Sequence, residues 1–371
     1  MKSVKVIIIL VFILFASCSK IVIRNVGVTS PWPQFGSNAA HTNFTNQNLT
    51  PPLKQVWQHR ASSALGNSIV VLDGIALFGT KDGRIEGVRI EDGKKAGRIK
   101  IKRNIPSTIA AYKNKLLIAR RIEQPTFEMY DVSKGKSIWK QKAKGIFGEP
   151  LIVGNMAVIS DLTSRLLAIS LADGSELWNY KLESKSDATA AYSNGIIVIG
   201  DDSGTVNALD ESGKVLWKFQ ADRAIRSAAS ISNNTVYIGS TNGTMYALDL
   251  QSGELIWSYE SNDKIYNAAA ISELHVVFGT TGHKVYCLNK QNGELEWTFE
   301  AKSLINTAPV IAGKVVYIGS LDKFMYGLDL STGEKVWAFE ARGRIISNPI
   351  VVNNHLLFAS QNDRLYCFTR E

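Results

Sequence analysis

Seven of the eight tryptophans in this 371-residue chain follow a regular spacing. They are Trp57, Trp139, Trp178, Trp217, Trp257, Trp297 and Trp337. From Trp139 onward the spacings are 39, 39, 40, 40 and 40 residues, and the 82 residues between Trp57 and Trp139 leave room for one more position, at Gly97. A period near 40 residues with strand signals inside it is typical of a circular or stacked array of repeats.

One repeat contains the signals for several short strands and none for a helix. Between residues 226 and 260, runs of β-branched, aromatic and small apolar residues alternate with turns that end at Gly243 and Gly253. Because Gly and Asn accept the positive φ of tight turns, such runs indicate antiparallel strands in hairpins. Four strands in about 40 residues make a propeller blade, so we predict an all-β fold.

A glycine stands four residues before each tryptophan position from residue 97 onward, including position 97 itself, where tryptophan is absent. These glycines are Gly93, Gly135, Gly174, Gly213, Gly253, Gly293 and Gly333. We expect them to hold a left-handed backbone conformation in the turn into the outer strand of each blade.

Counting the repeats predicts an eight-bladed β-propeller of four-stranded antiparallel blades over residues 53–371. The positions from residue 97 to residue 337 end seven complete blades, and residues 347–369 supply three further strands. The segment from Leu53 to Trp57 has the pattern of the missing outer strand, so the last blade is closed by an N-terminal strand. Closure removes free sheet edges. A seven-bladed ring is the alternative.

Residues 1–17 have the pattern of a lipoprotein signal peptide. Lys2 and Lys5 flank an apolar core that is too short to span a bilayer, and small residues precede Cys18. The segment resembles bacterial lipoprotein signals, whose cysteine becomes the lipidated first residue of the mature protein. We therefore expect lipidation of Cys18, with an ordinary signal peptide as the alternative.

The residue after Cys18 is Ser19, which by the same resemblance favours the outer membrane, on its periplasmic face. Residues 18–52, rich in Asn, Thr and Pro with few charges, are interpreted as the lipidated cysteine and a flexible tether. The remaining cysteines, Cys287 and Cys367, occupy equivalent positions two blades apart. A disulfide needs Cα atoms within about 7 Å, so both are predicted to be buried free thiols.

Charge divides the chain unevenly. Residues 81–144 contain 18 Lys and Arg against 7 Asp and Glu, whereas residues 145–371 contain 18 against 25. The first two blades are therefore basic and the others mildly acidic. This is either ordinary solvated surface or a contact surface for an acidic partner. We expect no nucleic acid partner for an exported lipoprotein.

The consensus of the repeat, Gly-x-x-Tyr-Ala-Leu-Asp followed by Ser/Thr-Gly-Glu-x-x-Trp, resembles the pyrroloquinoline-quinone (PQQ) repeat of β-propellers. The best copies span residues 243–257, 282–297 and 321–337, and residues 31–42 resemble the segment that often precedes the first blade of such proteins. The family includes quinone dehydrogenases. It also includes BamB-type lipoproteins of the outer-membrane β-barrel assembly machinery, which bind no quinone. The resemblance implies that the seven regularly spaced tryptophans dock neighbouring blades together.

The sequence offers little support for an enzyme. A quinone dehydrogenase of this family would need a calcium site near the axis, and the alcohol dehydrogenases among them carry adjacent cysteines. Here the blades have almost no insertions, no two cysteines are neighbours, and the five histidines have no metal-ligand spacing. We therefore expect no catalytic residue, no metal and no bound PQQ. A PQQ-dependent dehydrogenase is the remote alternative.

The preferred hypothesis is a lipid-anchored scaffold that binds other envelope proteins, with the barrel-assembly subunit as the candidate partner. The alternative is a binding module for a small ligand or glycan at the propeller funnel. The residues at or next to the start of each inner strand should surround the mouth of that funnel, unless they are merely exposed at a strand start. They are Asp187, Arg226, Ser227, Tyr266, Asn267, Asn306, Thr307 and Ser347.

Overall fold

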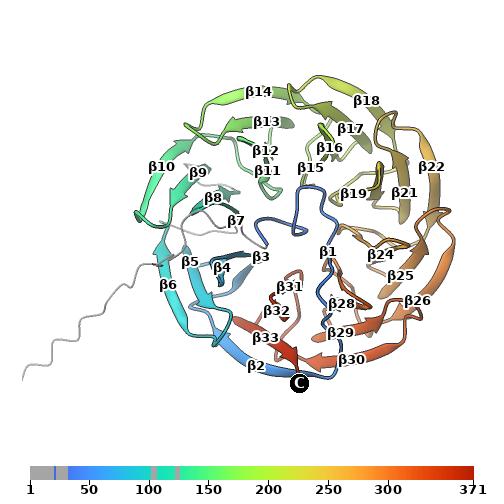
Figure 1. Cartoon of the computed structure of the whole chain (residues 1–371). Helices are drawn as coiled ribbons and strands as arrows, with labels where there is room; N and C mark the ends of the chain where they lie inside the picture. Colours follow the sequence, from blue (N-terminus) through green and yellow to red (C-terminus); the bar gives the residue numbers. More distant parts are fainter. Residues whose placement is uncertain (1–20, 22–31, 102–106, 122–125) are drawn as a thin grey trace, which may run out of the picture.

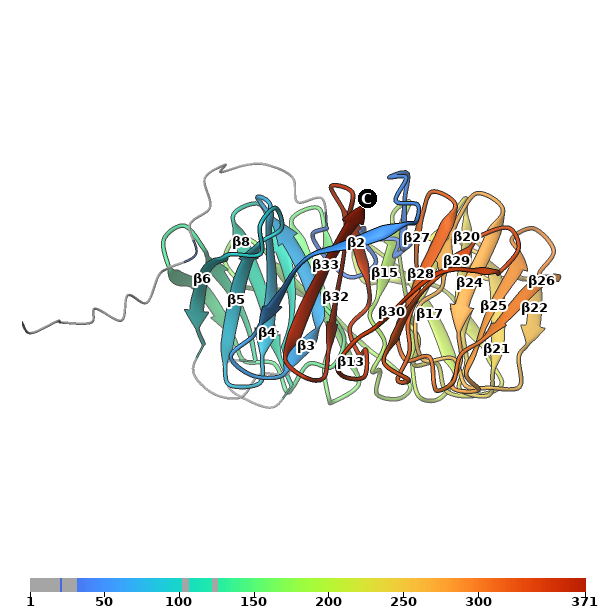
Figure 2. The same cartoon turned by 90° about the horizontal axis from the view of Figure 1, so that it is seen from below.

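The computed structural model describes Ile21 and residues 32–101, 107–121 and 126–371. These residues form eight sheets arranged as a ring around a central axis (Figure 1), and from the side the ring is a short cylinder (Figure 2). The predicted all-β fold and the eight blades are confirmed. The described residues contain no helix with the length and apolarity needed to cross a membrane.

Blades 1 to 4 follow each other along the chain, and each runs from an inner strand at the axis to an outer strand at the rim. Blade 1 is β3 (Leu65–Leu72), β4 (Ile75–Thr80), β5 (Arg84–Arg89) and β6 (Lys95–Lys100). Blade 2 is β7 (Ser107–Tyr112), β8 (Lys115–Arg120), β9 (Phe127–Asp131) and β10 (Lys136–Gln141). Blade 3 is β11 (Leu151–Val153), β12 (Met156–Ser160), β13 (Arg165–Ser170) and β14 (Glu176–Lys181). Blade 4 is β15 (Ala191–Ser193), β16 (Ile196–Gly200), β17 (Thr205–Asp210) and β18 (Val215–Gln220).

Blades 5 to 8 complete the ring. Blade 5 is β19 (Ser230–Ser232), β20 (Thr235–Gly239), β21 (Thr244–Asp249) and β22 (Leu255–Glu260). Blade 6 is β23 (Ala270–Ile271), β24 (His275–Gly279), β25 (Lys284–Asn289) and β26 (Leu295–Glu300). Blade 7 is β27 (Val310–Ala312), β28 (Val315–Gly319), β29 (Phe324–Asp329) and β30 (Lys335–Glu340). Blade 8 is β31 (Ile350–Val352), β32 (His355–Ser360), β33 (Arg364–Arg370) and the N-terminal β2 (Leu53–Arg60).

The two ends of the propeller meet in blade 8. Strand β2 pairs antiparallel with β33 along its whole length, from Leu53 opposite Arg370 to Arg60 opposite Arg364. The first strand of the propeller thus hydrogen-bonds to its last, as the tryptophan spacing predicted. Because this pairing uses the polar backbone groups on that edge of β33, blade 8 has four strands like its neighbours.

The tryptophans of the outer strands join neighbouring blades. In six of them the indole Nε1–H donates to a backbone carbonyl of the next blade, from Trp57 to Ile90 at 2.7 Å through Trp297 to Leu330 at 2.8 Å. Trp337 faces blade 8, where the chain ends, and packs edge-on against Phe368 instead. The carbonyl groups thus give six of the indoles the hydrogen-bond acceptor that a Trp N–H usually has when it is buried.

Six of the seven glycines before the tryptophan positions meet two requirements at once, and the exception is Gly135, whose preceding blade has Gly97 in place of tryptophan. Gly253, for example, has φ 75°, and a Cβ at this position would lie 2.6 Å from Cδ2 of Trp217. A left-handed conformation favours glycine, and the indole of the preceding blade leaves no room for any side chain. The glycine and the tryptophan therefore recur together because the glycine of one blade packs against the tryptophan of the preceding blade.

Residues 32–49, here called the axial segment, cross the ring at its centre (Figure 1). Six of its backbone carbonyls accept hydrogen bonds of 2.6–3.0 Å from inner-strand N–H groups of six different blades. The donors are Val71, Ala111, Tyr192, Ile231, Ile271 and Ile311. In the other two blades, the side-chain Oε1 atoms of Gln34 and Gln47 accept from Ile152 and Asn354. The axial segment thus bonds to all eight blades.

The inner strands explain why the axial segment adopts this path. Each inner strand pairs on one side only, so its other edge presents N–H groups that need acceptors. The segment supplies them, and its strand β1 (Phe44–Thr45) pairs parallel with β27, which gives blade 7 a fifth strand. From Trp32 onward the structure therefore differs from the flexible tether expected over residues 18–52. Trp32 and Leu49 are buried in the core.

Candidate functional site

The central funnel of the propeller is a cavity of about 460 Å³. It is lined by residues at or just before the inner strands of blades 2 to 8 and by Phe35 of the axial segment. The funnel residues precede the inner strands, whereas the axial segment bonds near the ends of those strands. One face of the axis is therefore closed by the chain itself and the other remains accessible.

Five of the eight residues predicted at the funnel mouth line this cavity: Asp187, Arg226, Tyr266, Asn267 and Asn306. The other three, Ser227, Thr307 and Ser347, are fully buried. Their hydroxyl groups donate to carbonyl groups of the adjacent strand, at Gly239, Gly319 and Ala359 respectively. These three hold the inner strand to its neighbour and do not reach the funnel.

Glu149, which the sequence did not single out, lies between the funnel and the axial segment. Its carboxylate accepts a hydrogen bond of 2.6 Å from Ser68 Oγ, and its own N–H donates to Thr189 Oγ1 at 3.0 Å. Burial raises the pKa of the Glu149 carboxyl to about 7, against the opposing effect of the Ser68 hydroxyl. Glu149 can therefore exchange a proton near neutral pH. Its only sequence signal was its place just after Gly148 at the start of an inner strand.

A second carboxylate faces the funnel from blade 4. Asp187 Oδ1 is buried and has no hydrogen-bond partner among the described residues. Arg226 stands nearby, but its guanidinium group is engaged with Asp202, with Nε 2.8 Å from Oδ1 and Nη2 3.2 Å from Oδ2. Asp202 also binds Lys185. The residue before it, Asp201, accepts a hydrogen bond from the N–H of Ser203 in the turn, so these two adjacent carboxylates have separate structural partners.

The lining residues could bind a neutral polar molecule or a cation. Besides Glu149 and Asp187, the funnel presents the carboxamides of Asn267, Asn306 and Asn348. PQQ is a planar quinone with three carboxylates, and such an anion needs cationic partners. Among the described lining residues, Arg226 is the one cation and it is already paired with Asp202. The donor set does not fit the quinone.

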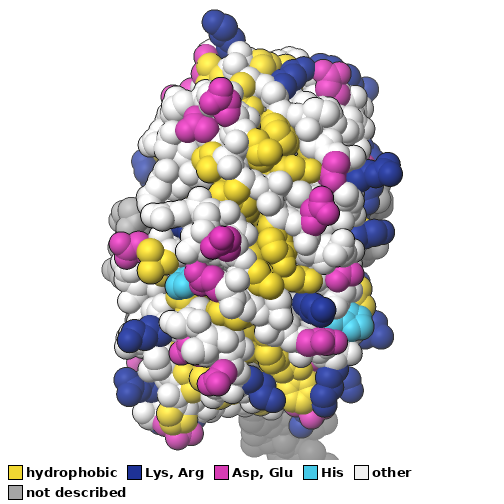
Figure 3. Space-filling view, turned by 90° about the vertical axis from the view of Figure 1, so that its right-hand side faces the viewer, with side chains coloured by type: hydrophobic (Ala, Val, Ile, Leu, Met, Phe, Trp, Pro, Cys, Tyr) yellow, Lys and Arg dark blue, Asp and Glu magenta, His cyan; other side chains and the backbone are white. Residues whose placement is uncertain are grey.

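An apolar band follows the outer rim of the ring (Figure 3). In every blade the residue just before the tryptophan position lies at a β-bulge, for example Ile256 between Leu255 and Trp257. Six of these bulge residues are exposed aliphatic side chains: Val56, Ile138, Leu177, Leu216, Ile256 and Val336. Blade 5 adds the exposed Leu255 to this band, and blade 6, whose bulge residue is Glu296, contributes the exposed Leu295. Exposed apolar patches of this kind often mark interaction surfaces.

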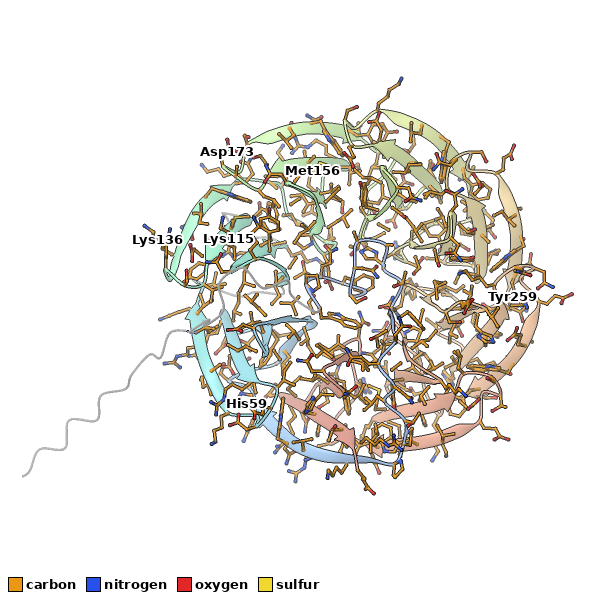
Figure 4. The ribbon with its side chains drawn as sticks, in the orientation of Figure 1. His59, Lys115, Lys136, Met156, Asp173 and Tyr259 are labelled. Atoms are coloured by element: carbon orange, nitrogen blue, oxygen red, sulfur yellow. The ribbon has the colours of Figure 1, made fainter. Side chains whose placement is uncertain are left out.

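The basic region of residues 81–144 covers blades 1 and 2. Lys136 begins the outer strand of blade 2 and Lys115 begins its second strand (Figure 4). Part of the charge is structural, because Arg120 and Glu128 form an ion pair whose side chains are each only 5% exposed. Near the closing blade, the carboxyl of Glu86 has its pKa lowered to about 2 because hydrogen bonds from His59 and Ser62 outweigh its burial. Lys94 and Lys134 are also paired, with Asp92 and Asp131, so only part of the surface charge is open to an acidic partner.

Cys18 and the signal peptide of residues 1–17 lie outside the described residues. Cys287 and Cys367 are buried free thiols, as predicted.

The ring, its glycine–tryptophan contacts and its closing strand define the class of protein as an eight-bladed propeller of PQQ-type repeats. A profile of the family described as outer membrane protein assembly factor BamB matches residues 81–191, 163–272 and 266–367. These matches cover well over half of the chain, and the chain belongs to this family.

Solved structures share the fold at low sequence identity. BamB from Moraxella catarrhalis superposes with a TM-score of 0.72 at 18% identity, over 85% of this chain and 99% of the other. A europium-containing methanol dehydrogenase reaches 0.77 at 13% identity, over 91% and 98%. The computationally designed Ika8 protein reaches 0.75 at 17% identity, over 87% and 99%. A comparison with curated protein sequences found no match. At these identities the likeness to solved structures establishes the fold alone.

Proposed function

We propose that this protein is a non-catalytic scaffold, lipid-anchored through Cys18 on the periplasmic face of the outer membrane, that binds other proteins of the outer-membrane β-barrel assembly machinery. The observation that carries the proposal is the match of the BamB family across residues 81–367. The uniform blades support it, because their short loops leave few elements that could carry catalytic groups.

The proposed contact surface is the apolar rim over blades 4 to 6, formed by Leu216, Leu255, Ile256 and Leu295. It is exposed, lies away from the funnel and differs from the rest of the rim by its two additional leucines. Burying such side chains against a periplasmic domain of a partner would contribute about 25 cal/mol per Å² of apolar surface. The partner would be another component of the assembly machinery.

Crosslinking in cells followed by mass spectrometry tests the scaffold. The lipid-anchored protein should crosslink to barrel-assembly subunits, and Ile256→Asp should reduce the yield several-fold. Leu177→Asp is the matched control, because Leu177 holds the same bulge position in blade 3 and is 54% exposed against 49% for Ile256. Recovery of no assembly subunit from the wild-type protein would refute the assignment, and equal loss in both variants would refute the chosen surface.

The anchor and the absence of catalysis have direct tests. Cys18→Ser should abolish labelling by a radioactive fatty acid and release the protein from outer-membrane fractions. Purified protein mixed with PQQ and Ca²⁺ should gain no bound-quinone absorbance and should not oxidise alcohols with a dye acceptor. A positive result in the second assay would instead place the protein among the quinone dehydrogenases.

A second candidate function is ligand binding in the funnel, favoured by the unpartnered Asp187 Oδ1. Carboxylate and carboxamide groups beside Tyr266 offer hydrogen bonds and an aromatic surface, which suit the hydroxyl groups of a glycan. A panel of oligosaccharides tested by thermal shift would reveal such a ligand, and Asp187→Asn should abolish its effect.

A further inference from the structure

Three metal-ligating side chains meet on blade 6, far from the funnel residues discussed above. His275 begins β24, Cys287 lies in β25 and Glu296 lies in β26. One donor atom from each residue lies within 4.8 Å of the others. His275 Nε2 is 3.0 Å from Glu296 Oε2, and Cys287 Sγ is 3.9 Å from the same oxygen. The five histidines showed no ligand spacing in the sequence, so only the fold reveals this cluster.

The strand register explains why these side chains meet. His275 is paired with Asn289, which is two residues from Cys287, so His275 and Cys287 project from the same face of the blade. Cys287 is paired with Trp297, and the β-bulge beside that pair contains Glu296. A bulge re-aims the extra side chain, and here it turns the Glu296 carboxylate towards the other two groups.

Glu296 departs from the pattern of the other blades. At its position just before the tryptophan, six of the other seven blades have the exposed aliphatic side chains of the rim band, and blade 1 has Ala96. The side chain of Glu296 is only 28% exposed and contacts His275. The repeat does not require a carboxylate here, so packing alone does not account for Glu296.

Blade 8 provides an internal comparison. It carries His355 and Cys367 at the positions of His275 and Cys287, but its bulge residue is Val56. Among the described residues, the histidine–cysteine pair thus occurs twice and the complete triad once. A shared repeat ancestry is enough to explain the pair, whereas the third ligand belongs to blade 6 alone.

Neighbouring groups orient two of the three ligands. Ser272 Oγ lies 3.2 Å from His275 Nδ1, which leaves Nε2 directed at the cluster. Asn289 Nδ2 donates to Glu296 Oε1 at 3.3 Å, which leaves Oε2 directed at the same point. Ligands of metal sites are usually fixed in this way by a second layer of hydrogen bonds.

We propose that His275, Cys287 and Glu296 bind a thiophilic divalent cation, Zn²⁺ in particular. Nitrogen, sulfur and oxygen donors in a four-coordinate site are the ligands that Zn²⁺ prefers, and three protein ligands leave the fourth position to water or to a group from a partner. Tetrahedral Zn²⁺ places its donors about 3.3 to 3.8 Å apart, so the side chains need only small rotations to close around the ion.

The site connects three strands of one blade and remains accessible from the rim. The side chains of His275 and Glu296 are 15% and 28% exposed, whereas Cys287 is buried behind them. A bound ion would therefore tie β24, β25 and β26 together beneath the apolar rim. Since binding occurs only in the folded blade, the ion should raise the stability of the protein.

Titration of the purified full chain with Co²⁺ tests the proposal, because a cobalt–thiolate bond gives a charge-transfer absorption in the near ultraviolet. One equivalent should bind and Zn²⁺ should displace it. Cys287→Ser should abolish the absorption, whereas Cys367→Ser, the equivalent change in blade 8, should leave it unchanged. No thiolate absorption in the wild-type protein, or an equal absorption in Cys287→Ser, would overturn the proposal.

Glu296→Val tests the carboxylate, because it gives blade 6 the three residues that blade 8 already has. It should weaken Zn²⁺ binding by about 100-fold, as measured by competition with a fluorescent chelator, while the circular dichroism spectrum stays unchanged. Unaltered affinity would show that Glu296 is not a ligand. The increase in melting temperature on adding Zn²⁺ should likewise disappear in Glu296→Val and persist in Cys367→Ser, and a shift that survives in Glu296→Val would count against the site.

Discussion

Gly253 lies against the indole of Trp217 in the preceding blade, so closely that a Cβ at Gly253 would stand 2.6 Å from Cδ2 of the ring. The same relationship recurs around the ring, for instance between Gly293 and Trp257 and between Gly333 and Trp297. Each contact joins the third turn of one blade to the outer strand of its neighbour. These contacts, with the indole hydrogen bonds, connect blades that share few backbone hydrogen bonds.

Gly253→Ala should therefore destabilise the protein by about 2 to 4 kcal/mol, because it combines a left-handed backbone with a steric clash. Chemical denaturation measures the change in the free energy of unfolding. Gly195→Ala is the control: Gly195 has φ 83°, and nothing lies within 4 Å of its hypothetical Cβ. This variant should lose only about 1 kcal/mol. Equal losses in both variants would mean that backbone conformation, and not the indole contact, explains the glycine.

The axial segment should protect the inner-strand amides from hydrogen exchange. The N–H of Ile271 donates to Thr42 O at 2.8 Å, and that of Ile231 donates to Ala40 O at 2.8 Å. Deleting residues 32–45 should speed exchange at both amides by at least tenfold, since they lose their acceptors. The amide of Ser272, which donates to His275 within blade 6, should change little. Mass spectrometry of deuterium uptake would show this contrast, and uniform acceleration would instead indicate global unfolding.

Glu149 should make stability fall as pH rises. Its pKa is raised from 4.5 to about 7 in the folded protein, so between these values the folded state binds more protons than the unfolded state. Stability is then unaffected below pH 4.5 and decreases as pH rises towards 7, by about 3 kcal/mol in total. Glu149→Gln should remove this dependence and be more stable than the wild type at pH 8. Urea denaturation across this range measures the difference, and a constant difference between the two proteins would contradict the assignment.

Glu128 should contribute far more to the stability of the folded protein than a surface carboxylate does. It is buried beside Arg120 and also accepts a hydrogen bond of 2.8 Å from Ser137 Oγ. Removing one member of a buried ion pair costs about 3 to 5 kcal/mol because the other charge stays buried, so Glu128→Gln should approach that loss in thermal or chemical denaturation.

Glu183→Gln is its control. Glu183 pairs with Lys218 at 2.7 Å, but their side chains are 57% and 40% exposed. Exposed pairs contribute about 0 to 1 kcal/mol. A large effect at Glu183, or a negligible one at Glu128, would show that burial does not govern these pairs.

Much of the architecture could be predicted from the local sequence pattern of strands, turns and tryptophans. The tryptophan spacing counted the blades, and Leu53 to Trp57 matched the strand missing from the last blade, because hairpins and their turns depend on neighbouring residues. The sequence predicted the residues that line the funnel only in part. Asp187 and Arg226 line the cavity, whereas Ser227 and Thr307 are buried by the strand that follows them. Two residues adjacent in sequence point to opposite sides of a strand, and the repeat alone does not say which side faces the axis.

The sequence by itself determined the number of blades, their order and the way the ring closes, since each repeat carries its own turns and its own contact with the next. Only the tertiary structure decided what happens at the axis and between strands of one blade. Residues 32–49 look like a linker in the sequence. They lie at the centre because their acceptor groups hydrogen-bond to N–H groups on the unpaired inner edges of the eight blades. Glu149 looks like a surface acid, yet burial raises its pKa to about 7. His275, Cys287 and Glu296 lie up to 21 residues apart, and antiparallel register with one β-bulge brings them together. Such features depend on groups that meet in space without any periodicity that joins them along the chain.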